Sequence, residues 1–295
     1  MDILIAGGNG FIGFHVASFF EATASIASID TISSNNHPNS TEIDLTDSLA
    51  VDEYASNCQT YDILIFLVGL AHAKGKGKDY QVFKEVNYQT LVNLTSSLDK
   101  NGKLPDKIIF SSTISVYGER FHQNIYSEVV ETIPFSPYAV TKLEAEKYLL
   151  DTYPDKCWIL RFAPVYSSTF TLNLDRRSKL RRYFYKVGNG QNKLSMCNLR
   201  NIMLSMGGVI DQLVPAGVYN ISDPRYYTYT DLLQYQGAKR PIRIPMFLVR
   251  VLFLVGLATK NIFLKENSVK LITNNVFPSD KINNFVNLTA TIDDI

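Results

Sequence analysis

The stretch DILIAGGNGFIG, residues 2–13, opens the chain with a short apolar run that ends in a cluster of glycines. The apolar run indicates a buried strand, and the residues that follow have the apolar spacing of a helix. Glycine between a strand and a helix permits a tight turn and lets backbone N–H groups approach an anion. Gly7, Gly10 and Gly13, with an additional Gly8, therefore predict a dinucleotide diphosphate at the first helix N-terminus.

Runs of residues typical of strands recur along the first half of the chain, with helical patterns between several of them. The runs are SIASID (25–30), TEIDLTD (41–47), YDILIFLVG (61–69), DKIIFSST (106–113) and CWILRFAPV (157–165). A long helical pattern covers 79–100, and SPYAVTK (136–142) begins another helix. Strands that alternate with helices form parallel sheets with right-handed crossovers. The predicted fold class is therefore α/β, a Rossmann-like doubly wound parallel sheet.

The alternation weakens after about residue 166, although VYNIS (218–222) resembles a late strand. We therefore expect two parts. Residues 1–166 would form a dinucleotide-binding Rossmann domain that also carries the catalytic residues. Residues 167–295 would form a smaller C-terminal substrate-binding lobe that is interleaved with the first.

The bulk composition excludes several classes of function. Lys and Arg number 29 against 28 Asp and Glu, and the net charge of +1 gives no reason to expect nucleic acid or an anionic membrane surface as a partner. The three cysteines are odd in number and far apart, which predicts free thiols in a reducing cytosol. Met1 is followed at once by Asp2, so we expect no signal peptide and a cytoplasmic protein. No metal is expected, because His15 and His72 share no metal-like spacing with a carboxylate or cysteine.

The most apolar stretch is MFLVRVLFLVGLA, residues 246–258. A span of the bilayer needs about 20 apolar residues, so this stretch is too short, and Arg250 interrupts it. No stable membrane span is predicted. We interpret the stretch as a buried helix of the C-terminal lobe, with attachment to a membrane surface as the alternative.

Carboxylates after the second and third strands bear on the type of cofactor. Asp30 ends the second strand, where a carboxylate accepts hydrogen bonds from ribose hydroxyls and repels a 2′-phosphate. No arginine lies nearby in the sequence to hold such a phosphate, so the pattern favours NAD over NADP. Asp44 and Leu45 are a plausible adenine contact, although Asp44 could equally be a turn residue.

SPYAVTK places Tyr138 and Lys142 four residues apart, on the same face of a helix. Tyrosine has a pKa of about 10 and needs a nearby positive charge to act as a base near neutrality. Lys142 can lower that pKa and also bind the ribose of a nicotinamide. SSTISVYG (111–118) adds hydroxyl groups at the carboxyl end of a strand, where open α/β sheets bind ligands. Each feature alone is common on protein surfaces, but their order on one alternating sheet favours redox chemistry.

From Met1 to about Tyr166 the chain resembles the extended short-chain dehydrogenase/reductase superfamily, in its NAD-dependent epimerase/dehydratase branch. GGNGFIG is similar to the glycine motif of that family, FSSTISVYG (110–118) to its FSSSATVYG-like segment, and SPYAVTK to its SPYGKSK-like segment. The resemblance implies that Tyr138 is the catalytic acid/base and Lys142 its partner. Thr113 falls where the 4-epimerases of the family have a catalytic serine.

The resemblance also implies cofactor contacts along the first half of the chain. VGLA (68–71) resembles the loop that lines the cofactor, and Asn87 takes the place of a structural asparagine. The expected cofactor-binding residues are Gly7, Gly10, Phe11, Ile12, Gly13, Asp30, Asp44, Leu45, Val68, Gly69, Asn87, Tyr138 and Lys142.

Departures from the family pattern limit the reaction. Ile114 and Ser115 stand where the dehydratases carry Asp and Glu, so 4,6-dehydration is not expected. RFAPVYS (161–167) lacks the asparagine that touches the nucleotide sugar in R-x-x-N-V-Y-G, and Thr90 replaces a glycine. These changes put the sugar specificity in doubt and leave the redox residues in place.

The resemblance leads to an NAD-dependent sugar-nucleotide 4-epimerase that acts on a UDP- or dTDP-hexose through a 4-keto intermediate. The alternatives are an NAD(P)H-dependent 4-ketoreductase and a non-catalytic NAD-binding protein, which would be expected to lose Tyr138 or Lys142. The implied partner is a nucleotide-sugar substrate, and a homodimer is usual in such families. The basic stretch 176–186 either faces water or brings some of Arg176, Arg177, Lys179, Arg181 and Arg182 to the substrate diphosphate.

Overall fold

The computed structural model describes residues 1–31, 39–71, 80–118 and 120–294, so His72 lies outside the described residues. The chain forms two compact units that alternate along the sequence. Unit 1 comprises Met1–Thr113, Pro137–Leu160 and Met206–Val218. Unit 2 comprises Ile114–Ser136, Arg161–Ser205 and Tyr219–Ile295. The assignment of cofactor and substrate to separate parts of the chain stays a prediction.

A seven-stranded sheet in the order β12-β6-β5-β4-β1-β2-β3 confirms the predicted Rossmann-like fold class. Its strands are β1 (Asp2–Ala6), β2 (Ser25–Asp30), β3 (Ser40–Glu42), β4 (Ile63–Phe66), β5 (Lys107–Thr113), β6 (Cys157–Phe162) and β12 (Gly217–Ile221). β1 pairs in parallel with both β2 and β4, and β4 pairs in parallel with β5. All four side chains of β4 are buried, as expected for a continuous apolar strand covered on both faces.

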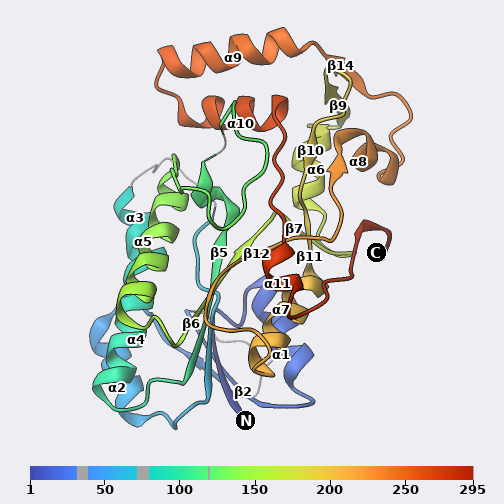
Figure 1. Cartoon of the computed structure of the whole chain (residues 1–295). Coiled ribbons are helices and arrows are strands. Elements are labelled where there is room, and N and C mark those ends of the chain that lie inside the picture. Colours follow the sequence, from blue (N-terminus) through green and yellow to red (C-terminus); the bar gives the residue numbers. More distant parts are fainter. Residues whose placement is uncertain (32–38, 72–79, 119, 295) are drawn as a thin grey trace. The chain divides into compact units, whose positions relative to one another are not determined.

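Helices cover both faces of this sheet, which makes it doubly wound (Figure 1). They are α1 (Phe11–Phe20), α2 (Ser48–Asn57), α3 (Tyr80–Lys84), α4 (Thr90–Lys100), α5 (Pro137–Thr152) and α7 (Leu199–Ile210). The predicted helix over 79–100 is interrupted, because a π-helix (Glu85–Gln89) separates α3 from α4. The predicted strand over 157–165 ends at Phe162, close to Pro164, which has no N–H to donate to a strand ladder.

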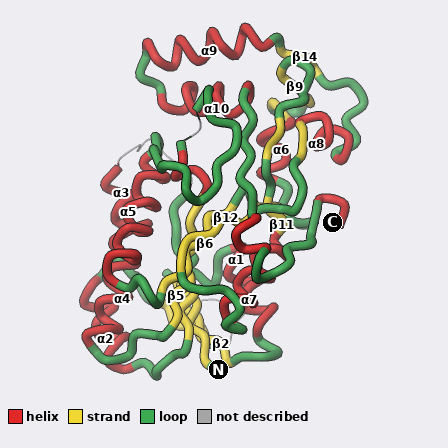
Figure 2. Tube along the Cα trace, in the orientation of Figure 1, coloured by secondary structure: helices red, strands yellow, loops and turns green. Residues whose placement is uncertain are grey.

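Unit 2 contains short strands and helices joined by long loops (Figure 2). The strands are β7 (Val165–Tyr166), β8 (Lys179–Leu180), β9 (Tyr183–Val187), β10 (Lys193–Leu194), β11 (Cys197–Asn198), β13 (Tyr227–Thr228) and β14 (Ile242–Ile244). The helices are α6 (Leu172–Ser178), α8 (Tyr229–Tyr235), α9 (Met246–Ala258), α10 (Ile262–Ile272) and α11 (Asp280–Asn283), with 3-10 turns at Ile114–Tyr117 and Ile292–Asp294.

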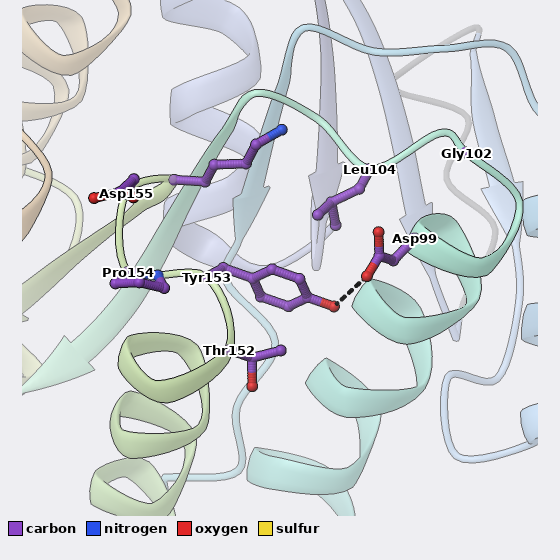
Figure 3. Close-up of a pocket in the computed structure, with 8 residues that line it drawn as sticks. Asp99, Gly102, Leu104, Thr152, Tyr153, Pro154 and Asp155 are labelled. Atoms are coloured by element: carbon purple, nitrogen blue, oxygen red, sulfur yellow. Dashed lines mark hydrogen bonds between the residues drawn. The ribbon is translucent and has the colours of Figure 1, made fainter.

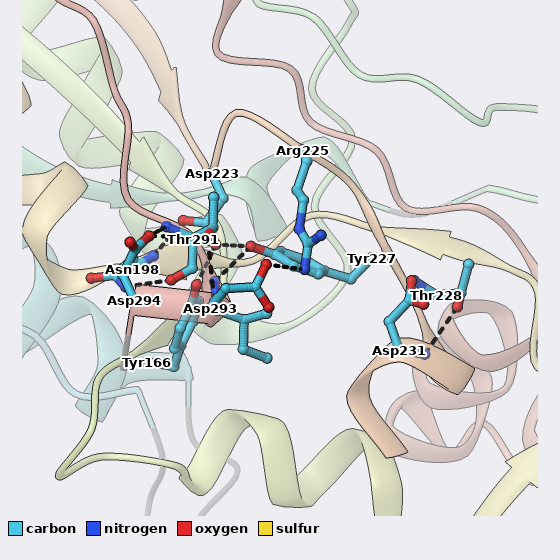
Figure 4. Close-up of polar contacts among 11 residues, drawn as sticks. Tyr166, Asn198, Asp223, Arg225, Tyr227, Thr228, Asp231, Thr291, Asp293 and Asp294 are labelled. Carbon is cyan, nitrogen blue, oxygen red and sulfur yellow. Dashed lines mark hydrogen bonds and ion pairs between the residues drawn. The ribbon is translucent and has the colours of Figure 1, made fainter. Parts of the chain in front are cut away.

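A buried carboxylate, Asp223, holds several of these short elements together (Figure 4). Its oxygens accept hydrogen bonds from the hydroxyls of Tyr166 (2.5 Å) and Tyr227 (2.8 Å). They also accept from the backbone N–H of Asn198 (2.6 Å) and the side-chain amide of Asn201 (2.9 Å). Burial raises the pKa of Asp223 to about 6, and the four donors oppose this rise. The carboxylate therefore replaces part of the apolar core that such short elements cannot supply.

The stretch 246–258 forms a helix with the predicted bounds, but the prediction that this helix is buried is wrong. Within α9 only Val249 and Gly256 are buried. The helix packs against α10 (Figure 1), Val249 joins a small buried cluster with Tyr185 and Val187 of β9, and most of the other large side chains of the helix are exposed. An apolar sequence predicts the helix, but burial of these side chains depends on contacts that the described chain does not provide. None of the described helices is long and apolar enough to cross a membrane.

Gly118 and Gly102 both have positive φ, but only at Gly118 would an added Cβ also meet another part of the chain. Gly118 has φ of 63°, and a Cβ there would lie 1.8 Å from the carbonyl oxygen of Ile133. Gly102 has φ of 65° and nothing within 4 Å of the same position. Gly102→Ala should cost about 1–2 kcal/mol of unfolding free energy from the left-handed conformation alone. Gly118→Ala should cost clearly more in urea-induced unfolding, because the Ile133 carbonyl must also move. Equal losses in the two variants would contradict the close approach at Gly118.

Candidate functional site

The glycine turn between β1 and α1 has the geometry of an anion cradle. Gly7 has φ of 85°, and its carbonyl accepts a hydrogen bond from the N–H of Gly10 (3.2 Å). A Cβ on Gly13 would lie 2.3 Å from that same carbonyl oxygen, so only glycine fits there. Gly10 caps α1, and Phe11 and Ile12 open it, so their N–H groups belong to the first turn of the helix, where backbone N–H groups point toward the N-terminal end. This turn can hold a diphosphate by backbone N–H groups and the helix dipole.

Asp30 lies next to the glycine turn. Its carboxylate accepts hydrogen bonds from the backbone N–H groups of Asn9 (3.1 Å) and Thr31 (2.8 Å). The end of β2 therefore brings an acceptor to the turn that would hold a diphosphate. This position agrees with the predicted contact to a ribose hydroxyl, which stays a prediction.

Asp44 and Leu45 lie in a turn after β3. The Asp44 carboxylate accepts from the N–H (2.9 Å) and hydroxyl (2.8 Å) of Thr46, so it forms a local turn. The side chain of Leu45 is buried in the core beneath the sheet, and its carbonyl accepts from Asn93. These contacts show Asp44 in the turn role that the sequence left open, and the adenine contact stays a prediction.

The loop after β4 forms a second wall beside the glycine turn. A Cβ on Gly7 would lie 3.0 Å from the backbone nitrogen of Val68, so the two segments are in close contact. Asn87, from the π-helix, holds this loop: its Oδ1 accepts from the N–H of Leu70 (2.6 Å) and its Nδ2 donates to Thr141 Oγ1 (3.1 Å). Gly69 is exposed, and a Cβ there would lie 3.1 Å from Lys142 Nζ. Asn87 thereby positions the loop against α5.

The first turn of α5 brings Tyr138 to the carboxyl end of β5, where Thr113 ends the strand. The two side chains are hydrogen-bonded, and Thr113 is buried. Burial raises the pKa of the Tyr138 phenol, and the hydrogen bond with Thr113 opposes this rise. The predicted tyrosine and threonine are therefore together at the sheet edge where open α/β folds bind ligands.

Lys142 is buried one turn after Tyr138. Its Nζ donates to the carbonyls of Val68 (3.1 Å) and Ser111 (3.0 Å) and lies 4.7 Å from the centre of the Phe110 ring. Burial lowers the pKa of Lys142 from 10.5 to about 7, and the charge of Glu146 opposes this shift. The structure thus gives Lys142 two carbonyl partners, and its effect on the pKa of Tyr138 stays a prediction.

The sequence reasoning missed a carboxylate beneath this site. Glu146 is buried one turn after Lys142 and accepts a hydrogen bond from the Ser112 hydroxyl. The signal was available, because Glu146 follows Lys142 by four residues on the same helix face. Its contribution is electrostatic: it keeps more of the buried lysine protonated than burial alone would.

The basic stretch divides into exposed and partly buried residues. Arg176, Arg181 and Arg182 are exposed, and Lys179 pairs with Asp175 (2.7 Å). Arg177 instead lines a narrow cavity of about 20 Å³ in unit 2. Other lining residues are Pro164, Ser195, Tyr229, Lys270 and Asn275. Asn275 is buried, and its Oδ1 has no hydrogen-bond partner among the described residues.

A larger hollow of about 540 Å³ lies away from this chemistry (Figure 3). It is bounded by Asp99 in the last turn of α4, by Gly102 after that helix, and by Tyr153 and Lys156 after α5. These segments lead into β5 and β6, so the hollow lies at the amino ends of those strands. Open α/β sheets bind their ligands at the opposite, carboxyl ends. The volume of this hollow is therefore no reason to place the active site there.

Comparison with known proteins agrees with this geometry. The model of the NAD dependent epimerase/dehydratase family matches residues 3–203. A probable UDP-arabinose 4-epimerase of Arabidopsis thaliana is 26% identical over 204 residues, which cover 63% of this chain and 44% of that protein. An uncharacterized UDP-glucose epimerase of Bacillus subtilis is 28% identical over 185 residues, or 56% of this chain and 57% of that protein. The chain thus matches about half the length of these relatives.

Solved structures show the same fold over a larger share of the chain. A UDP-Glc/GlcNAc 4-epimerase of Campylobacter jejuni has a TM-score of 0.76 at 19% identity and covers 98% of this chain and 94% of its own. The UDP-glucose 4-epimerase of Thermotoga maritima has a TM-score of 0.67 at 24% identity, with 83% and 86% covered. The fold and the site define an extended short-chain dehydrogenase/reductase. Within that class, the chain belongs to the NAD dependent epimerase/dehydratase family.

The buried ammonium of Lys142 predicts a pH-dependent stability. Between pH 7 and 10.5 the unfolded chain holds the lysine proton while the folded chain releases it, so wild-type stability rises with pH. Lys142→Met removes this term, and its stability relative to wild type should fall with rising pH by up to about 1.4 kcal/mol per pH unit. Urea unfolding at several pH values measures the slope, and the exposed Lys147→Met on the same helix is the control. Parallel stability curves for wild type and Lys142→Met would refute the buried, shifted lysine.

Proposed function

We propose that this protein is an NAD-dependent sugar-nucleotide 4-epimerase that acts on a UDP- or dTDP-hexose through a 4-keto intermediate. The observation that carries the proposal is the hydrogen-bonded pair of Tyr138 and Thr113 at the carboxyl end of β5, with Lys142 one helical turn away. This arrangement provides one group that can exchange a proton and a second that can hold the same oxygen.

The residues of unit 1 fit NAD. A Cβ on Gly13 would lie 2.3 Å from the Gly7 carbonyl oxygen, so glycine lets the turn pack tightly against α1, and the opening turn of α1 would offer N–H groups to a diphosphate. Asp30 would accept hydrogen bonds from the adenosine ribose, and the loop at Val68 and Gly69 would face the nicotinamide half. When bound, NAD supplies the site with an acceptor for the hydride of the sugar C4 and later returns it.

Tyr138 would move the proton. As phenolate it takes the proton of the sugar 4-hydroxyl, and after the keto sugar has turned it returns this proton to the 4-oxygen. Thr113 would hold that oxygen and, as its hydrogen bond lowers the pKa of the phenol, favour the phenolate. Lys142, held by two carbonyls, would present its remaining N–H to the nicotinamide ribose. The overall reaction is redox-neutral, so the cofactor is retained.

Arg177 and Lys270 would hold the substrate diphosphate. Both line the cavity of unit 2, which is also lined by buried Asn275, whose Oδ1 has no hydrogen-bond partner in the part of the chain that the structure describes. The cavity itself is too small for a nucleotide sugar, so the proposal concerns the two cations rather than the enclosed space. A guanidinium suits a diphosphate because its donors match two oxygens at once.

A 4-ketoreductase is the second candidate. Pro164, which stands where the family has an asparagine, lines the same cavity as Arg177 and cannot donate a side-chain hydrogen bond. A changed sugar contact favours a different sugar reaction on the same redox centre. Purified protein that interconverts UDP-hexoses without added cofactor supports the epimerase, whereas stoichiometric consumption of NADH with a keto sugar supports the reductase. A non-catalytic NAD-binding role is disfavoured, because Tyr138, Lys142 and Thr113 are all retained.

Tyr138→Phe tests the catalytic assignment. The variant loses the hydroxyl that exchanges the proton, so turnover should fall by about 100-fold or more. NAD binding, followed by fluorescence titration, should change little because the glycine turn is untouched. Activity that survives this substitution would remove Tyr138 from the mechanism, and loss of NAD binding together with activity would point to a structural role.

Arg177→Ala tests the diphosphate contact. Loss of a charge-assisted hydrogen bond should raise KM for the nucleotide sugar about tenfold or more, with a smaller effect on kcat. Arg176→Ala is the matched control, because it removes the same charge from the exposed neighbouring position. The two variants would behave alike if the effect were only one of net charge, and the assignment of Arg177 would then fail.

A further inference from the structure

Helix α9 packs by one stripe only. Val249 and Gly256 are buried, and Phe253 contacts the ring of Phe121 with 4.7 Å between ring centres. At 100° per residue these positions share one side of the helix. A Cβ on Gly256 would lie 2.9 Å from the backbone nitrogen of Lys265, so α10 approaches this side closely. Val249, Phe253 and Gly256 therefore define the packed side of α9.

The other sides of α9 are apolar and exposed. Each of seven large side chains leaves 42–63% of its surface uncovered. They are Phe247, Leu248, Val251, Leu252, Leu254, Val255 and Leu257. Single exposed apolar residues are ordinary on protein surfaces, but a contiguous group of this size marks an interaction site.

The charged residues that flank α9 in the sequence, up to Lys265, are of one sign, and Glu266 on α10 follows them. Residues 237–265 contain no Asp or Glu and six basic residues, although the whole chain is nearly balanced. Five of these basic residues are exposed: Lys239, Arg240, Arg243, Arg250 and Lys260. Three precede the helix, one follows it, and Arg250 is the single charge within it. Their long stems can lie along an apolar surface while the charged ends reach outward.

We propose that α9 is a membrane-docking helix, which rests its exposed apolar face on a bilayer surface that contains anionic lipids. Its 13 residues are too few to cross a bilayer but suit a helix that lies in the interfacial plane. The flanking cations complement anionic headgroups. A second copy of the chain is the disfavoured occupant, because a symmetric contact would bring two sets of basic residues together. This inference is independent of the proposed epimerase activity.

Flotation of the full chain with lipid vesicles tests the proposal. The protein should float with vesicles of phosphatidylcholine and phosphatidylglycerol, and much less with phosphatidylcholine alone. Leu254→Glu, in the exposed face, should reduce binding at least tenfold, while the matched control Leu213→Glu, at a similarly exposed leucine, should bind as wild type does. Lys239→Ser should weaken binding to the anionic vesicles about fivefold and the exposed Lys147→Ser hardly at all.

Circular dichroism confirms that the variants remain folded. Wild-type protein that does not float with either type of vesicle would overturn the proposal. If it then elutes as a dimer that Leu254→Glu dissociates, a second copy covers α9 instead. Equal binding to both types of vesicle would also contradict the proposal as stated, since the basic residues would have no part in it.

Discussion

The buried ammonium of Lys142 joins the parts of the candidate site to one another. A charge in a core is tolerated only when its donors are satisfied, and here the carbonyls of Val68 and Ser111 satisfy two of them. The first carbonyl belongs to the loop after β4 and the second to β5. The same loop presses against Gly7 of the glycine turn. The position of the anion cradle is thus coupled, through one side chain of α5, to the position of Tyr138.

The fold of the first half of the chain could be predicted because its sequence patterns are local. β1 and β4 are apolar runs, β2 and β5 contain shorter apolar stretches, and each strand is recognisable within a window of several residues. The glycines and the Tyr138–Lys142 spacing are local patterns as well, so their places at the carboxyl edge follow from the sheet order. The carbonyl partners of Lys142 could not be predicted, because backbone groups leave no signature in the sequence.

Unit 2 was harder to predict for a physical reason. Its short elements are held by Asp223, whose partners Tyr166, Asn198, Asn201 and Tyr227 are polar and spread over some sixty residues of sequence. Polar residues in loops follow no helix or strand period, so no sequence pattern predicts that these residues contact one another. The cavity lined by Arg177, Lys270 and Asn275 could not be predicted for the same reason. The basic stretch indicated positive charge, but not that Arg177 is the residue of that stretch that lines a cavity.

The net charge of +1 does not reveal that basic residues and exposed apolar side chains are concentrated at α9 and in the residues that flank it. Averaged over the chain, the composition argued against an anionic membrane surface, yet 237–265 is basic throughout and carries the exposed apolar helix. Covering seven half-exposed apolar side chains would contribute at most about 5–10 kcal/mol, and each nearby cation about 1 kcal/mol on an anionic bilayer. Partial immersion and lost mobility reduce this sum, which leaves an affinity suited to reversible attachment. Local distribution of charge, rather than its total, therefore decides what this surface can bind.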